Sequence, residues 1–155
     1  MSKWYSKISS DPSNSNLIVD AVIYFEDQLE KAKFEVSLKG NVEKASSELP
    51  GLVERRFREL QEVEAILKFL EIQRDHAKDL AFRTYLENYN KVLSSRDAER
   101  YASGEQKVVD LSLLINQVAF IRNLYAGIMK GLDVKHWQIN NVVKLRSHGI
   151  EDFEV

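Results

Sequence analysis

Hydrophobic residues recur at helical spacing over most of this chain. From Leu17 to Lys39 they follow one another at steps of three, four or five, and Gly40 ends the run. A second run extends from Leu52 towards Asn90 without a glycine or proline, and a third extends from Glu105 to Lys130. The pattern predicts long amphipathic helices rather than a sandwich or a βαβ fold.

Two of these runs carry the heptad-type seam of a coiled coil. In the second run the seam consists of Leu60, Val63, Leu67 and Leu70. In the third run it consists of Leu111, Leu114, Val118, Ile121, Tyr125 and Ile128. More apolar residues lie beside the third seam, namely Val109, Leu113, Phe120 and Leu124. A helix this apolar needs several neighbours, so we predict that the third seam joins copies of the chain into an oligomer.

Glycine, proline and capping residues predict where the shorter elements begin and end. A short helical piece is expected at Val42–Ser47, followed by a corner at Pro50-Gly51. Ser95 can cap a brief helix that extends to Ala102.

The stretch after the third run has an organisation of its own. Gly131 is typical of a helix end and Asp133 of an N-cap, while Leu132 and Trp137 have the spacing of a hydrophobic staple. We therefore expect a separate short helix over Val134–His148, ended by a glycine.

Together these elements predict an all-α fold: a long helical hairpin with coiled-coil-like seams and a short C-terminal helix, assembling into an oligomeric ring or barrel. With 155 residues, 6 Gly and 2 Pro, the chain fits one domain of long helices. Residues 1–15 are expected to form a flexible lead-in, residues 16–149 the helical domain, and residues 150–155 an acidic tail.

Composition and spacing argue against several kinds of chemistry. The chain has no cysteine, which excludes disulfides and thiolate metal sites. His76, His136 and His148 lack zinc-ligand spacing, and no phosphate loop or catalytic motif is found. We expect no catalytic residue, metal or cofactor, and hence no enzyme. Since no apolar run approaches the ~18–20 residues of a membrane span, we expect a cytoplasmic protein without a membrane partner.

Positive charge gathers in one place, although the net charge is -2. The stretch Val134–His148 contains Lys135, Lys144, Arg146 and Trp137 but no acid. Bases can stack on an indole while cations bind phosphates, so this pattern favours single-stranded nucleic acid. The alternative is that Trp137 packs in a core or an interface and that the cations are ordinary solvated charge.

A further basic set lies on the second run and consists of Arg74, Lys78 and Arg83. Asp75 and Asp79 lie beside it, so a surface lattice of ion pairs is an alternative to nucleic-acid binding.

The segment Lys130-Gly131-Leu132-Asp133-Val134-Lys135-His136, with Gln138, resembles a motif of the phage UvsY recombination mediators. In that family a basic residue, a glycine, a large apolar residue, any residue, Ile or Val, and a lysine follow a long helix. A second, shorter match is Glu71-x-Gln73-Arg74-x-x-Ala77, followed by Tyr85. The chain departs from the family at Ala81–Glu87, where Ser-Gly is absent, and at Asp79 and Ala81, which replace basic residues.

The resemblance implies a function and partners. UvsY-like proteins form closed helical oligomers, bind single-stranded DNA, and contact both the recombinase and the single-strand-binding protein. They help to load the recombinase onto the coated strand. From the pattern and the resemblance together, the expected DNA-binding residues are Lys130, Lys135, His136, Trp137, Lys144, Arg146, Arg74, Lys78 and Arg83. The alternative is a non-enzymatic structural or adaptor protein, such as a phage assembly factor or coiled-coil scaffold, without DNA binding.

Overall fold

The computed structural model describes residues 3–88 and 93–149 of the chain. These residues form the helices α1 (Lys3–Ser10), α2 (Asn16–Glu35), α3 (Val42–Asn88), α4 (Ser95–Ser103) and α5 (Gln106–Ser147). No strand occurs in the described part of the chain, so the predicted all-α fold is confirmed. The predicted acidic tail, residues 150–155, lies outside the described residues.

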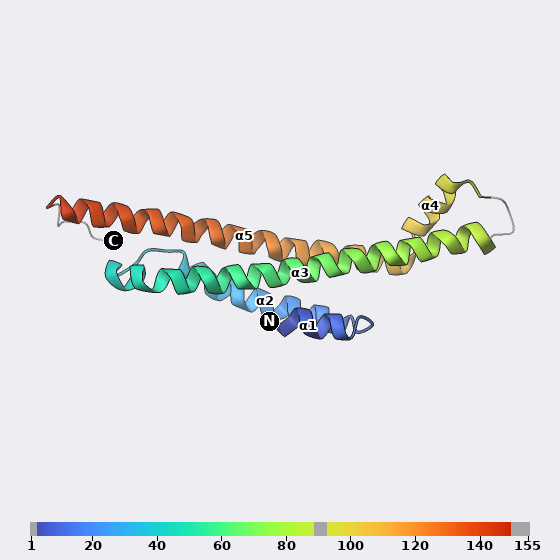
Figure 1. The fold of residues 1–155 in the computed structure, drawn as a ribbon, viewed down its shortest axis with the longest axis horizontal. Coiled ribbons are helices and arrows are strands. Elements are labelled where there is room, and N and C mark those ends of the chain that lie inside the picture. Colours follow the sequence, from blue (N-terminus) through green and yellow to red (C-terminus); the bar gives the residue numbers. More distant parts are fainter. Residues whose placement is uncertain (1–2, 89–92, 150–155) are drawn as a thin grey trace.

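Helices α3 and α5 form a long antiparallel hairpin along the longest axis of the molecule (Figure 1). Helix α2 packs against α5, and α1 packs against both α2 and α3. These two helices cover the middle of the hairpin on one side, whereas α4 lies at the end where α3 stops (Figure 1). The molecule is therefore a rod: α4 packs beside the end of α3 at one end, and α5 extends past the start of α3 at the other (Figure 1).

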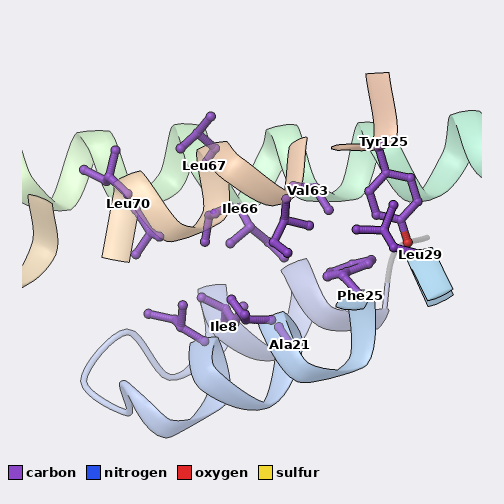
Figure 2. Close-up of a cluster of buried hydrophobic side chains, with 14 residues drawn as sticks. Ile8, Ala21, Phe25, Leu29, Val63, Ile66, Leu67, Leu70 and Tyr125 are labelled. Atoms are coloured by element: carbon purple, nitrogen blue, oxygen red, sulfur yellow. The ribbon is translucent and has the colours of Figure 1, made fainter. Parts of the chain in front are cut away.

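The main core lies between α1, α2, α3 and α5 (Figure 2). Val63, Ile66 and Leu70 of α3 are each 1% exposed. They share this core with Phe25 of α2 and Tyr125 of α5, whose rings meet edge to face with centroids 6.0 Å apart. Burying one such side chain contributes about 1.5–3 kcal/mol, which is why the seams decide the arrangement of the helices.

The α5 seam packs inside this chain. Val118, Ile121 and Tyr125 are at most 3% exposed, and Leu111, Leu114 and Ile128 pack against the same core. The prediction that this seam joins copies of the chain is therefore wrong, because α2 and α3 supply its partners. The apolar residues beside the seam face solvent instead. They are 38–62% exposed and form what we call the outer line: Val109, Leu113, Phe120 and Leu124.

The expected flexible lead-in is wrong for Lys3–Ser10, which forms α1. Ile8 is 1% exposed and belongs to the main core. The Glu62 carboxylate of α3 accepts hydrogen bonds from the backbone amides of Trp4, at 2.6 Å, and Tyr5, at 3.4 Å. Amides in the first turn of a helix have no acceptor within it. Glu62 therefore caps α1 from a neighbouring helix. The local sequence of α1 gives no signal for this contact.

Helix α3 is continuous through Pro50 and Gly51. The predicted separate piece at Val42–Ser47 and the corner are therefore wrong, whereas the uninterrupted second run is confirmed as far as Asn88. Proline lacks the amide that would bond the carbonyl four residues earlier. Leu49, which is 6% exposed, packs against α5 and holds the turns before the proline in place.

Helix α5 likewise continues through Gly131. The predicted stop there, the cap at Asp133 and the separate helix over Val134–His148 are wrong. Leu132 is fully buried while Trp137 is 65% exposed, so the two do not form the predicted staple. Beyond the glycine the buried stripe continues at steps of three and four, and its packing outweighs the ~1 kcal/mol cost of glycine in a helix.

Gly131 has a packing role. Helix α2 ends at Glu35, before the predicted end at Lys39, and the chain then crosses over α5. A Cβ atom at position 131 would lie 2.8 Å from Val36 Cγ1. Only glycine allows the backbone of α5 to come so close to Val36. The residue that predicted a helix end therefore marks a close contact between two segments.

Among the helices of residues 3–88 and 93–149, only α5 is long and apolar enough to cross a membrane, with a mean hydropathy of 1.2 over 18 residues. This differs from the expectation that no run approaches that length. The outer line and the seam together produce the high hydropathy. Only 22% of that window is buried inside the molecule, because the seam packs in the core while the outer line faces solvent.

Candidate nucleic-acid interface

The C-terminal half of α5 presents cations and an indole ring to solvent. Trp137 is 65% exposed, and Lys130 and Lys144 are exposed as well. These residues are seven positions apart, so they follow one face of the helix at intervals of about 10.5 Å. His148 lies one turn beyond Lys144 on the same face and is also exposed. We call Lys130, Trp137, Lys144 and His148 the ridge.

Three cations of this region have no acidic partner among residues 3–88 and 93–149. Lys130, Lys144 and Arg146 form no ion pair with any carboxylate of the described residues. Elsewhere on the surface some cations are paired, as Lys31 is with Asp27 at 2.6 Å, whereas others, such as Arg83 and Arg100, form no ion pair within the described residues. A bound anion would therefore not have to displace a carboxylate already paired within the described chain.

The two histidines of this region hold local hydrogen bonds. His136 Nε2 lies 3.1 Å from the Asn140 side-chain amide, and the His136 ring meets the Trp137 ring edge-on at 6.4 Å. His148 Nδ1 lies 2.7 Å from the Lys144 carbonyl oxygen. Since a carbonyl only accepts, Nδ1 carries the hydrogen in that bond. His136 is thus exposed but points away from the ridge, 100° from Trp137 around the helix.

Lys135 does not belong to this surface. It is 7% exposed, and its Nζ donates a hydrogen bond of 2.8 Å to the Glu35 carbonyl oxygen at the end of α2. A cation in this place stabilises the negative end of the α2 helix dipole. The prediction that Lys135 binds DNA is therefore wrong, and the residue fastens α2 to α5.

Lys135 is part of a buried group of charges where α2, α3 and α5 meet. Arg56 of α3 is 1% exposed and donates to both carboxylate oxygens of Glu35, at 2.8 Å, and to Glu59, at 2.7 Å. We call Glu35, Arg56, Glu59 and Lys135 the charged layer. Each charge in it has an opposite charge or a carbonyl dipole as partner, as burial requires.

Glu35 and Arg56 hold each other in the charged form. Burial raises the pKa of Glu35, but the hydrogen bonds and charge of Arg56, with the charges of Arg55 and Lys135, outweigh burial and leave the pKa below its ordinary value. Burial lowers the pKa of Arg56, whereas Glu35 and Glu59 raise it by more. Glu35 and Arg56 are therefore both charged at neutral pH, and their contacts fix α2 against α3.

The basic set on α3 is far from the ridge. Arg74 bonds Asp75 at 2.7 Å, Lys78 pairs with Glu99 of α4 at 3.2 Å, and Arg83 is exposed. Ile66 of α3 shares the core with Ile121 of α5. From that level Arg74 lies about 12 Å towards one end of the rod, and Trp137 lies about 24 Å towards the other. The structure thus does not bring Arg74, Lys78 and Arg83 together with the other predicted DNA-binding residues.

The charged layer is the feature that the sequence pattern missed, although a signal for it exists. Followed backwards from Leu60 by steps of four and three, the α3 seam reaches Arg56 and then Val53. Followed forwards from Ile128, the α5 seam reaches Leu132 and then Lys135. Two cations at seam positions indicate that buried carboxylates or carbonyl oxygens lie beside them as partners.

An apolar groove of about 700 Å³ lies beside the ridge. The segment after α2 contributes Val36 and Leu38, and α5 contributes residues that include Val134, Gln138, Val142 and Leu145. Leu145 stands between Lys144 and Arg146 in the sequence, so cations flank this end of the groove.

The part of the chain that the structure describes holds no group of three or more His, Asp or Glu side chains placed to bind a metal ion. No family model, curated protein or solved structure matches the chain. What the protein binds is therefore inferred from the geometry of its own residues.

Proposed function

We propose that the protein binds single-stranded DNA through the ridge on α5 and acts as a recombination mediator. It would help a recombinase to load onto strand coated by single-strand-binding protein. The observation that carries the DNA-binding proposal is an exposed indole between two lysines, none of them engaged by a carboxylate of the described residues. Stacking of a base on an aromatic side chain contributes about 1–3 kcal/mol, and the lysines bind phosphates on either side.

The mediator role rests on the resemblance of Lys130–His136 to the UvsY motif. Two motif residues, Gly131 and Lys135, hold the end of α2 against α5. The motif therefore supports a shared arrangement of helices more than a shared set of DNA contacts. In this chain the contacts to DNA are assigned to the ridge, whereas Arg146 lies about 180° from Trp137 around α5.

Self-association belongs to the same proposal. Besides the outer line of α5, helix α2 exposes Ile23 at 59% and Phe34 at 81%. An apolar surface of this extent is typical of a protein–protein interface. Copies that cover it would repeat the ridge along one DNA strand, and several weak contacts would then act together.

The first experiment measures binding of a fluorescent oligo-dT to the full chain by anisotropy, at low and at moderate salt. We expect binding at low salt that weakens as salt rises, with a log–log slope of about -0.7 for each phosphate contact. Absence of binding at low salt would refute the proposal.

Paired variants locate the site. The double substitution Lys130→Ala with Lys144→Ala should weaken binding by about tenfold or more and reduce the salt slope by about 1.4. The control is Arg58→Ala with Lys68→Ala, which removes the same charge from exposed positions of α3 that are paired with Glu54 and Glu71. An equal loss in both variants would mean that net charge, and not the ridge, governs binding.

Trp137 is tested separately. Because its ring is 65% exposed, Trp137→Ala should leave the melting temperature unchanged. The loss of stacking should weaken oligo-dT binding by about 5- to 150-fold, whereas Trp137→Phe should retain most of the affinity. A lowered melting temperature with unchanged DNA affinity would assign Trp137 to packing instead.

A helical adaptor or structural protein without DNA binding is the second candidate. The outer line favours this candidate, because Leu113 and Phe120 are more than half exposed. Exposed apolar side chains of this kind are typical of a surface that binds another protein. This candidate predicts an oligomer or a protein complex by light scattering and no oligo-dT binding at any salt concentration.

A further inference from the structure

We infer that the apolar groove beside the ridge binds the chain's own C-terminal segment, Ile150–Val155, and that this contact screens the ridge from DNA. The screening rests on the proposed DNA binding. The docking of the segment does not depend on DNA binding, because it follows from the groove, the length of the segment and its chemistry.

The groove is a preformed apolar surface. Its walls are Val36 and Leu38 after α2, and Val134, Val142 and Leu145 on α5. Val134 is 57% exposed on this face. A volume of about 700 Å³ is in the range of sites that bind small molecules or a few side chains of a peptide.

Two backbone hydrogen bonds and a left-handed glycine end α5. The backbone amides of His148 and Gly149 donate to the carbonyl oxygens of Leu145 and Arg146, each at 3.1 Å. Gly149 has φ +76, the left-handed conformation with which helices commonly end. A chain that leaves in this way departs from the helix axis and can fold back along the helix.

The reach of the segment matches the position of the groove. From Gly149 to Phe153 an extended chain covers about 13–14 Å. Along α5, the distance from Asn141 to Gly149 is about 12 Å. Phe153 can therefore reach the groove between Asn141 and Leu145, opposite Leu38.

The segment and the groove are complementary in chemistry. Apolar Ile150, Phe153 and Val155 alternate with acidic Glu151, Asp152 and Glu154. The groove has an apolar floor. Lys144 and Arg146 are the neighbours of Leu145 in sequence, and His148 lies one turn beyond Lys144. Apolar side chains in the groove would place carboxylates beside these cations. Lys144 would then be neutralised while the segment is bound, and its phosphate contact would be lost.

Disulfide trapping tests the docking in the full chain, which has no cysteine of its own. Phe153→Cys is combined with Leu38→Cys in the groove, and the rate of closure under mild oxidation is measured on non-reducing gels. A disulfide needs Cβ atoms about 3.5–4.5 Å apart, so we expect a closed monomer. The matched control combines Phe153→Cys with Ile23→Cys, which is 59% exposed on α2 and lies outside the groove. It should close at least about tenfold more slowly.

Equal rates in the two pairs would overturn the docking. A disulfide-linked dimer as the main product would mean that the segment of a second copy fills the groove, and would overturn the intrachain contact. Because Leu38→Cys removes a groove side chain, circular dichroism checks the fold. Phe153→Cys with Leu145→Cys serves as a second pair, and the docking requires it to close as a monomer too.

Charge-neutral variants test the screening. Glu151→Gln, Asp152→Asn and Glu154→Gln together should tighten oligo-dT binding by about three- to tenfold at low salt, with little difference at high salt. The control neutralises three exposed acids without ion pairs elsewhere: Asp20→Asn, Glu26→Gln and Asp79→Asn. An equal gain in the control would overturn the screening. If no variant binds oligo-dT, the proposed function fails, while disulfide closure still decides the docking.

Discussion

Gly127 and Gly131 lie one turn apart on α5 and have opposite surroundings. A Cβ atom at 131 would lie 2.8 Å from Val36, whereas one at 127 would meet nothing within 4 Å. Alanine is favoured over glycine in a helix by about 1 kcal/mol, but an extra methyl group in a packed contact costs about 1–3 kcal/mol.

We predict that Gly127→Ala raises the melting temperature by about 2–4 °C and that Gly131→Ala lowers it. Thermal unfolding followed by circular dichroism measures both. If Gly131→Ala were stabilised as much as Gly127→Ala, Val36 would not be pressed against α5.

The charged layer gives the protein a specific response to acid. The folded-state pKa of Glu35 lies below its ordinary value of 4.5 because of Arg56 and its neighbours. A carboxylate with a depressed pKa stabilises the fold at pH values above the unfolded-state pKa. Its contribution is lost as the pH falls through the folded-state pKa.

We therefore predict that the free energy of unfolding of the wild-type chain falls from about pH 5 downwards. The free energy of unfolding of the Glu35→Gln variant should fall less steeply over this range. Urea unfolding at a series of pH values measures the difference. Parallel curves for the two proteins would show that Glu35 does not contribute to the pH dependence.

The contrast between Lys135 and Trp137 shows what the sequence could and could not predict of the candidate site. Both belong to one acid-free stretch, yet one is 7% and the other 65% exposed. To distinguish the buried residue from the exposed one, the α5 seam must be continued through Gly131. The sequence pattern predicted a helix end at that glycine instead. The continued seam places Lys135 inside and leaves Lys130, Trp137 and Lys144 outside.

At the scale of elements, α1 is held by one carboxylate of α3. Glu62 accepts from the backbone amides of Trp4 and Tyr5, and removing a capping group costs about 0.5–2 kcal/mol. Glu62→Ala should therefore loosen α1 while the hairpin stays folded.

Hydrogen exchange measures this prediction. Amides of Lys3–Ser10 should exchange faster in Glu62→Ala, whereas amides around Val63 and Ile121 should remain protected. The control is Glu64→Ala, an exposed position on the same helix whose carboxylate accepts only from Gln61 among the hydrogen bonds described. Equal exchange of α1 in both variants would contradict the capping role.

The long helices could be predicted because their seams repeat over many turns, and the continuity of those helices could not. Pro50 and Gly131 carry local costs of about 3 and 1 kcal/mol. Burial of Leu49 near the first and Leu132 beside the second outweighs these costs, and burial depends on a partner helix that local patterns do not contain. For the same reason α1 was missed, since its only buried residue is Ile8.

At the scale of the whole molecule, the outer line is the largest unexplained apolar surface of α5. We predict that Leu113→Glu with Phe120→Glu lowers the mass of the assembly and leaves the helix content unchanged, because both side chains are at least 60% exposed. Light scattering after size exclusion gives the mass. The control, Ser46→Glu with Gln61→Glu, adds the same charge at exposed positions of α3 and should keep the mass. A monomeric wild-type chain would contradict self-association.

The charged layer also sets the alignment of the rod. Two helices joined by aliphatic seams can pair almost equally well after sliding by one heptad, about 10.5 Å. Because Lys135 and Gly131 hold the end of α2 on α5, such a slip would move Arg56 of α3 away from Glu35. Breaking a buried ion pair costs about 3–5 kcal/mol. The hairpin therefore has one permitted alignment. Matched heptads could be added to or removed from α3 and α5 on either side of the layer. The part of the hairpin that carries Trp137 can therefore change length in evolution, while the part that holds α1 and α2 stays the same.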